Sequence, residues 1–131
     1  MDLDEDLKCE EHEAPYLICV LKSKKEKDHM ACEIYAICPV DQKMETRSLD
    51  IPIEEIEKLN LPLADKIFRC EKCFREANIQ DIAMEKKSVI IYLVCPEHGF
   101  LIERDISNDL YDGIRFAWDT KDQKLQKEYT V

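Results

Sequence analysis

The sequence predicts a small α+β protein in which two β-hairpin units, each followed by a helical segment, are stabilised by bound metal. Three observations lead to this fold class. In the second half, three cysteines and one histidine form two close pairs that flank a hairpin-like stretch. A weaker copy of this pattern precedes it in the first half. Apolar residues at helical spacing follow each copy. We place one unit at residues 1–66 and the other at residues 67–131, a total length that suits one domain or two small ones.

The composition is that of a folded protein. Hydrophobic residues make up 45% of the chain, and two glycines and five prolines are too few for a low-complexity linker. The chain has no apolar run of the length needed for a membrane span, and its start, MDLDEDLKCEEHE, is acidic where a secretory signal would be basic and then apolar. We therefore expect a soluble, cytoplasmic protein with reduced thiols and no contact with a membrane.

The cysteine count and the charge distribution narrow the function classes. Seven cysteines are an odd number, which favours metal binding or free thiols over a disulfide framework. The net charge is −10, and residues 1–13 contribute seven acidic side chains against one lysine. We interpret this start as a solvating tail. The chain has no overall basic excess of the kind that indicates nucleic-acid binding.

The pairs Cys70-x-x-Cys73 and Cys95-x-x-His98 predict a zinc site, because thiolate and imidazole are ligands that zinc prefers. A two-residue gap forms a tight turn, here called a knuckle, that directs two side chains to one point. The segments NIQDIAM and SVIIYLV between the pairs indicate two strands joined by a polar turn. Such a hairpin returns the second pair to the first. A redox Cys-x-x-Cys pair would be expected at a helix N-terminus in a βαβ setting, and none is evident.

The first half contains a weaker copy of this pattern. The segment starting at Ile34, IYAICPVDQKMETR, aligns without a gap with IYLVCPEHGFLIER, which starts at Ile91, an offset of 57 residues. Upstream, CEEH from Cys9 corresponds to CEKC from Cys70 at an offset of 61. The difference of four residues falls in a longer polar hairpin tip, KSKKEKD, in the first half. The simplest explanation is a duplicated unit.

The copy provides a candidate second metal site. Its ligands would be Cys9, His12, Cys38 and Asp41, where Asp41 takes the place of the histidine in the second half. A carboxylate can bind zinc, but it is uncommon in structural zinc sites. Two interpretations stay open: the chain binds two zinc ions, or the first copy has lost its metal and is maintained by packing.

Two further expectations concern the remaining cysteines and the helices. Cys19 and Cys32 are expected roughly opposite each other across the first hairpin, as small buried residues. After each hairpin, apolar residues recur at the spacing of a helix, which predicts two helical segments. We expect Pro62 to interrupt the first segment. In the second segment, we expect Phe116 and Trp118 to pack against a hairpin. The spaced apolar residues are Ile53, Ile56, Leu59 and Leu63 in the first segment and Ile106, Leu110, Ile114 and Trp118 in the second.

Residues from about 66 to 115 resemble the N-terminal zinc ribbon of a group of archaeal radical-SAM proteins. In that ribbon a Cys-x-x-Cys knuckle is followed about twenty residues later by Cys-Pro-x-His-Gly, then by a short strand and an acidic, aromatic segment. The matching residues are Cys70, Cys73, Cys95, Pro96, His98 and Gly99, and ISNDLYDGI has the same character as the acidic segment. The chain lacks a Cys-x-x-x-Cys-x-x-Cys cluster motif and is too short for the catalytic barrel. The resemblance implies an accessory zinc ribbon of archaeal type without radical chemistry. The first half shares only the repeat relationship, from which we interpret residues 1–66 as a degenerate zinc-ribbon-like copy.

The leading functional hypothesis is a non-enzymatic zinc-binding protein that acts as a protein-interaction or accessory module. The motif residues serve as ligands, and no separate nucleophile, base and orienting group can be identified. The partner would be another protein, and the acidic start would suit a basic one. A catalytic zinc would need an open coordination position, which only the site containing Asp41 could offer, and no general base is identifiable near it.

The alternative is a nucleic-acid-binding zinc ribbon of the transcription or translation machinery. Lysines crowd both hairpin tips, and clustered lysines can contact phosphates without reading sequence. These lysines are Lys22, Lys24, Lys25 and Lys27 in the first tip and Lys86 and Lys87 in the second. Against this alternative, lysine-rich turns are usually only solvated, and the net charge opposes binding to nucleic acid.

Overall fold

A computed structural model describes residues 2–100 and 103–129, with side chains described up to residue 122. The strands form one mixed sheet with the order β3-β2-β1-β7-β5-β4, and β6 pairs with β5. The strands are β1 (Leu17–Lys25), β2 (His29–Ile37), β3 (Met44–Pro52), β4 (Asn78–Met84), β5 (Ser88–Cys95), β6 (Gly99–Phe100) and β7 (Arg104–Ser107). The small α+β class is therefore confirmed, but the two hairpins share a single seven-stranded sheet.

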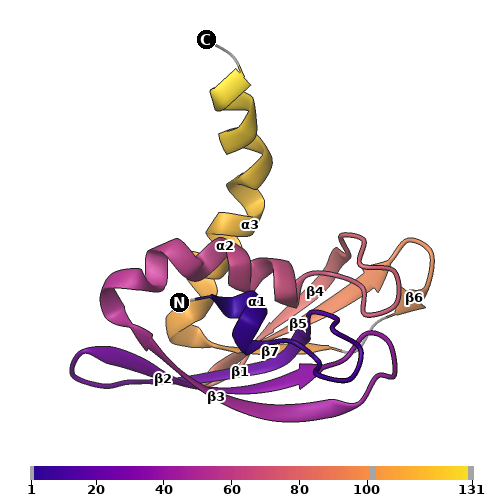
Figure 1. The fold of residues 1–131 in the computed structure, drawn as a ribbon. Helices are drawn as coiled ribbons and strands as arrows, with labels where there is room; N and C mark the ends of the chain where they lie inside the picture. Colours follow the sequence, from indigo (N-terminus) through magenta and orange to yellow (C-terminus); the bar gives the residue numbers. More distant parts are fainter. Residues whose placement is uncertain (1, 101–102, 130–131) are drawn as a thin grey trace.

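The helices lie over one face of this sheet (Figure 1). They are α1 (Leu3–Asp6), α2 (Ile56–Ile67), which follows a 3-10 turn at Ile53–Glu55, and α3 (Asn108–Tyr129). The N-terminal part of α3 packs against α2, and the rest of α3 extends away from the sheet (Figure 1). Within the described residues, none of the helices combines the length and the apolar character needed to cross a membrane.

The short strand β7 joins the two halves. It runs antiparallel to β5 and parallel to β1, where Asp105 lies opposite Val20 and Ile106 lies opposite Leu21. Side chains from both halves meet in one buried cluster, which includes Leu21, Ile34, Val89, Ile91 and Ile106. The division at residues 66 and 67 stays a prediction, and the sheet and the core are continuous across it.

Strand pairing follows the same register in both halves. Ile34 lies opposite Arg47 in the β2–β3 pair, and Ile91 lies opposite Arg104 in the β5–β7 pair, which is the offset of 57 seen in the sequence. The hairpins also agree, because each first strand has one bulge at the same place. These bulges lie between Ile18 and Val20 in β1 and between Ile79 and Asp81 in β4.

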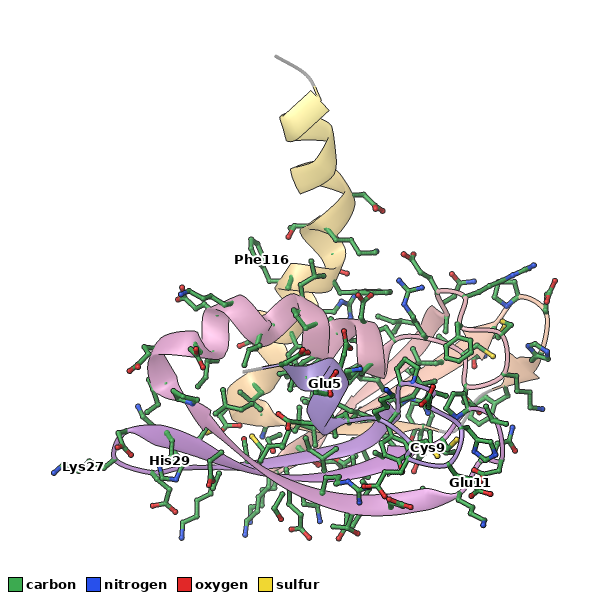
Figure 2. The ribbon with its side chains drawn as sticks, viewed as in Figure 1. Glu5, Cys9, Glu11, Lys27, His29 and Phe116 are labelled. Carbon is green, nitrogen blue, oxygen red and sulfur yellow. The ribbon has the colours of Figure 1, made fainter. Side chains whose placement is uncertain are left out.

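This topology fixes where the motifs lie. Since β1 is parallel to β7, and β7 and β4 are both antiparallel to β5, the strands β1 and β4 run in the same direction. Both knuckle pairs therefore lie at one end of the sheet, and both lysine-rich tips lie at the other. Figure 2 shows this separation in the first half, where Cys9 is at one end and Lys27 and His29 are at the opposite end.

Cys19 and Cys32 do not lie opposite each other across the first hairpin, so this prediction is wrong. Cys32 lies opposite Ser23, and Cys19 falls in the bulge of β1. The bulge and a turn two residues later than expected shift the register, so that Cys32 belongs to the main core and Cys19 to a small separate cluster with Leu17 and Ile37. All seven cysteines are free thiols.

Three other expectations need correction. Pro62 does not interrupt α2, because it lies on the exposed side of the helix, where water can hydrogen-bond the carbonyl that its missing N–H leaves unpaired. Phe116 is 70% exposed, whereas Trp118 is buried and stacks on Phe68 with ring centroids 5.4 Å apart. Ile106 belongs to β7 and precedes α3.

The acidic start is not a free tail in residues 2–13. Leu3 and Leu7 are buried in the main core, and Asp4 forms an ion pair with Lys66 of α2 at 3.0 Å. The charged side chains of α1 are exposed, while Leu3 within the helix and Leu7 directly after it are buried, which gives this short segment an apolar face toward the core.

We predict that Leu7→Ala will lower the free energy of unfolding by about 2–4 kcal/mol, because it leaves a cavity in the core. Urea unfolding of the metal-loaded protein measures this change. The control is Leu61→Ala, whose side chain is 37% exposed and whose loss should change stability by about 0.5 kcal/mol or less. Equal, small effects of both substitutions would contradict a packed N-terminal segment.

Candidate metal centre

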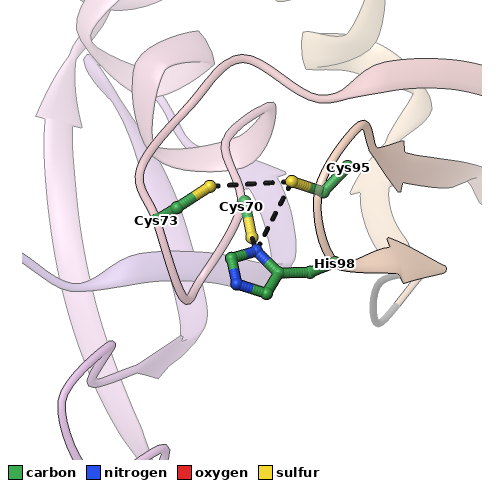
Figure 3. A group of neighbouring side chains, drawn as sticks. All are labelled: Cys70, Cys73, Cys95 and His98. Carbon is green, nitrogen blue, oxygen red and sulfur yellow. Dashed lines mark hydrogen bonds between the residues drawn. The ribbon is translucent and has the colours of Figure 1, made fainter.

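The main site is assembled from two turns at the same end of the sheet. Cys70 and Cys73 lie in the loop between α2 and β4, Cys95 ends β5, and His98 lies in the turn before β6 (Figure 3). The first knuckle closes through a hydrogen bond from the Phe74 backbone N–H to the Cys70 carbonyl. The structure thus brings together all four residues that the sequence predicts for this site.

The second turn needs a left-handed backbone position directly after His98. Gly99 occupies it with a φ of 76°, a value that glycine adopts without steric cost. The first half has Gln42 at the corresponding position, with a φ of 62°. The same turn therefore forms in both halves, at the expense of a strained non-glycine residue in the first.

Distances between the four ligand atoms fit one tetrahedral ion. Cys70 Sγ and Cys95 Sγ lie 3.5 and 3.6 Å from His98 Nδ1, and Cys73 Sγ lies 3.6 Å from Cys95 Sγ. Tetrahedral zinc with ordinary bond lengths would separate sulfur from nitrogen by about 3.5 Å and sulfur from sulfur by about 3.8 Å. This group could therefore hold a metal ion with all four coordination positions filled by the protein.

Backbone amides tune the thiols of the main site. Burial would raise the pKa of Cys95, but hydrogen bonds from the backbone N–H groups of His98 and Glu97 outweigh it and lower the pKa to about 6. Burial raises the pKa of Cys70, opposed by the Lys72 backbone N–H, which donates to its sulfur at 3.4 Å. A thiolate is the form that binds metal, so Cys95 is suited to be the first anionic ligand.

The structure also brings together three of the four residues predicted for the first site. His12 Nδ1 lies 3.5 Å from Cys9 Sγ and 3.6 Å from Cys38 Sγ, the same spacing as in the main site. Asp41 Oδ2 lies 3.7 Å from His12 Nδ1, compared with about 3.4 Å expected for two ligands of one tetrahedral zinc. The group Cys9, His12 and Cys38 could hold a metal ion, with Asp41 beside it.

In the first site, backbone hydrogen bonds favour the metal-binding forms of Cys9 and Asp41, whereas burial raises the pKa of Cys38. The backbone N–H of His12 lowers the pKa of Cys9, and the hydrogen bond with Cys9 in turn raises the pKa of His12. The Lys43 backbone N–H donates to Asp41 Oδ1 at 3.0 Å and lowers the pKa of that carboxyl. One carboxylate oxygen is thus engaged by the turn, and the other faces the ligand group.

Sequence reasoning missed the role of Arg104, which has no exposed surface. Its guanidinium donates to the carbonyl of Ile67 at 3.0 Å, the carbonyl of Arg69 at 3.2 Å and the carboxylate of Glu71 at 3.2 Å. These three acceptors lie in the chain that enters the Cys70 knuckle. Arg104 therefore holds in place the stretch of backbone that leads into the Cys70 knuckle of the main site. The only signal in the sequence was that an arginine occurs at the corresponding position of both halves.

The predicted lysines lie far from both ligand groups. Lys22, Lys24, Lys25 and Lys27 are exposed on the first hairpin tip, and Lys86 and Lys87 are exposed on the second. Asn108, at the start of α3, holds the second tip through hydrogen bonds to the carbonyls of Glu85 and Lys86. The two tips share one end of the sheet but are separate from the metal-ligating residues.

Comparisons with known proteins give no family for this chain: no family model matches it, and neither the curated proteins nor the solved structures contain a significant match. The site is therefore interpreted from its own geometry.

We predict that Arg104→Ala will lower the free energy of unfolding by about 3–5 kcal/mol, because it leaves the buried carboxylate of Glu71 without its partner. Thermal or urea unfolding measures the loss. Arg47→Ala is the matched control, since Arg47 is partly exposed and its ion pair with Glu45 should contribute about 1 kcal/mol or less. A loss for Arg104→Ala no larger than that of the control would contradict the anchoring role.

Proposed function

We propose that this protein is a non-enzymatic zinc-binding protein, built from two zinc-ribbon-like units, that acts in the cytoplasm as an interaction or accessory module for another protein. The observation that carries the proposal is the group of Cys70, Cys73, Cys95 and His98, whose ligand atoms lie within 4.8 Å of one another, with three separations of 3.5–3.6 Å. Three sulfurs and one nitrogen match zinc better than magnesium or calcium, which take oxygen ligands. Four protein ligands leave no position for a substrate, as in structural zinc sites.

A second zinc ion at Cys9, His12 and Cys38 is part of the proposal. The spacing of these three ligands supports it, and Asp41 would provide the fourth ligand or share that position with water. Because a carboxylate replaces an imidazole and its contact is long, this ion should be bound more weakly than the one in the main site. The equal strand registers, matched bulges and repeated knuckles support descent of both sites from one duplicated unit.

The surroundings of the first site favour a structural role over catalysis. A hollow of about 250 Å³ lies beside it, and Glu45 is one of the carboxylates on its wall. Hydrogen bonds from Tyr16 and then from Arg47 lower the pKa of Glu45. A general base works best with a pKa near the working pH, so this carboxylate is a poor base.

We predict two zinc ions per chain in protein purified with zinc, measured by elemental analysis against protein concentration. Cys70→Ser should remove one ion and strongly destabilise the fold, and Cys9→Ser should remove the other with a smaller effect. Cys32→Ala should retain both, because this buried thiol lies outside both ligand groups.

Retention of two ions by Cys70→Ser would contradict the main site. A single ion in the wild type that is also retained by Cys9→Ser would restrict zinc binding to the second half.

The alternative function, nucleic-acid binding, has one structural feature in its favour: the topology places both lysine-rich tips at the same end of the sheet. Acidic side chains next to these lysines, among them Glu26, Asp28 and Glu85, reduce the positive potential there. The leading proposal therefore predicts no shift of RNA or DNA in a gel at low salt.

A salt-dependent shift would support the alternative if it disappears when Lys24, Lys25 and Lys27 are replaced by alanine. The matched control replaces three exposed lysines away from the tips, Lys43, Lys58 and Lys72, and so removes the same charge. A shift that survives both sets of substitutions would exclude Lys24, Lys25 and Lys27 as the contact surface.

A further inference from the structure

The second half contains a socket filled by a guanidinium group. Arg104 of β7 enters it and donates hydrogen bonds to the carbonyls of Ile67 and Arg69 and to the carboxylate of Glu71. Two carbonyls and one carboxylate around a planar, fork-shaped donor form an arrangement that suits arginine better than lysine. The residue beside this socket at the start of the hairpin is Ala77, which is buried and small.

The first half has an open hollow lined by the counterparts of the residues that hold Arg104. A hollow of about 310 Å³ opens between α1 and the first knuckle, and six residues line it. They are Glu5, Asp6, Lys8, Glu10, Glu13 and Arg47. At the offset of 61, Asp6, Lys8 and Glu10 correspond to Ile67, Arg69 and Glu71, the three residues that hold Arg104.

The backbone around the two sockets has the same hydrogen bonds. Cys9 N–H donates to the Ala14 carbonyl as Cys70 N–H donates to the Arg75 carbonyl, and an isolated bridge joins Lys8 to Pro15 as another joins Arg69 to Glu76. The loop that presents the acceptors is therefore built in the same way in both halves.

Arg47, the counterpart of Arg104, lines the hollow, but its guanidinium is engaged by other residues. Its guanidinium lies 5.5 Å from the centre of the Tyr16 ring and forms an ion pair with Glu45. Tyr16 stands where the second half has Ala77, so the first half has a large buried ring at a position where the second half has a small side chain.

We propose that the acidic hollow of the first half binds an arginine side chain of a partner protein. This inference rests on the interaction role in the proposed function and names the chemistry of the partner. Four carboxylates face two cations in the hollow, so that it attracts a positive charge, and all four acidic residues are exposed and accessible. The acidic residues alone would not identify the ligand; the identification comes from the guanidinium held by the corresponding residues of the second half.

The test uses the zinc-loaded full chain, labelled with ¹⁵N, and the blocked tripeptide acetyl-Gly-Arg-Gly-amide at low salt. We expect saturable amide shifts confined to the α1–knuckle region, residues 5–16, and weaker binding of the lysine tripeptide by at least about threefold. Glu10→Gln should weaken arginine binding about tenfold, because it removes a charge-assisted hydrogen bond. Glu54→Gln, an exposed acid elsewhere, removes the same charge and should leave the affinity unchanged.

Three results would overturn the inference. Equal shifts with arginine and lysine, spread over many acidic residues, would indicate general charge attraction. If the arginine tripeptide bound to the Arg47→Ala variant but not to the wild type, the hollow of the wild type would be occupied by Arg47 itself. If the tripeptide bound to neither protein, the hollow would not accept a guanidinium group. Zinc content measured on the same samples separates these failures from a failure of the zinc-binding proposal.

Discussion

The rest of the structure depends on the position of β7 between β5 and β1. Four residues of strand, Arg104–Ser107, turn two hairpins into one sheet, and the parallel pairing with β1 sets the relative direction of both halves. Both ligand groups consequently lie at one end of the sheet and both polar tips at the other. The same strand carries Arg104 into the core, where its buried guanidinium ties the loop of the main site to the sheet. A strand of four residues forms few hydrogen bonds, so β7 contributes little stability through its own pairing. Its importance lies in connecting β5 to β1 within one sheet.

The two halves use one construction for different purposes. In the second half the fourth residue of the ligand group is His98, the left-handed turn position is Gly99, and the guanidinium of Arg104 is buried against Glu71. In the first half the corresponding residues are Asp41, Gln42 and Arg47, and an open acidic hollow lies beside the first knuckle. We infer that the second half is the stabilising half, since structural zinc contributes on the order of 10–16 kcal/mol in small peptides. We propose that the first half serves in recognition.

Much of this arrangement could be predicted from the sequence, and the failures have physical causes. Cysteine spacing predicted which residues come together, because tetrahedral coordination leaves few alternatives, and the run of β-branched residues in β5 predicted the hairpin. The register of Cys19 could not be predicted, because a single bulge in β1 moves it to the other face. Strand β3 and the central place of β7 were missed, since their pairing is decided by partners distant in the chain. Leu3 and Leu7 were hidden among acidic residues, although both are buried.

X-ray absorption at the zinc edge tests the central claim most directly, because it counts the atoms bound to the metal. Two ions, one with three sulfurs and a nitrogen and one with two sulfurs, a nitrogen and an oxygen, predict an average of about 2.5 sulfur ligands per zinc. In Cys9→Ser the average should rise to three sulfurs with one nitrogen, as only the main site remains occupied. A shell of oxygen and nitrogen ligands, without about two to three sulfurs per zinc, would contradict the claim that these knuckles bind zinc.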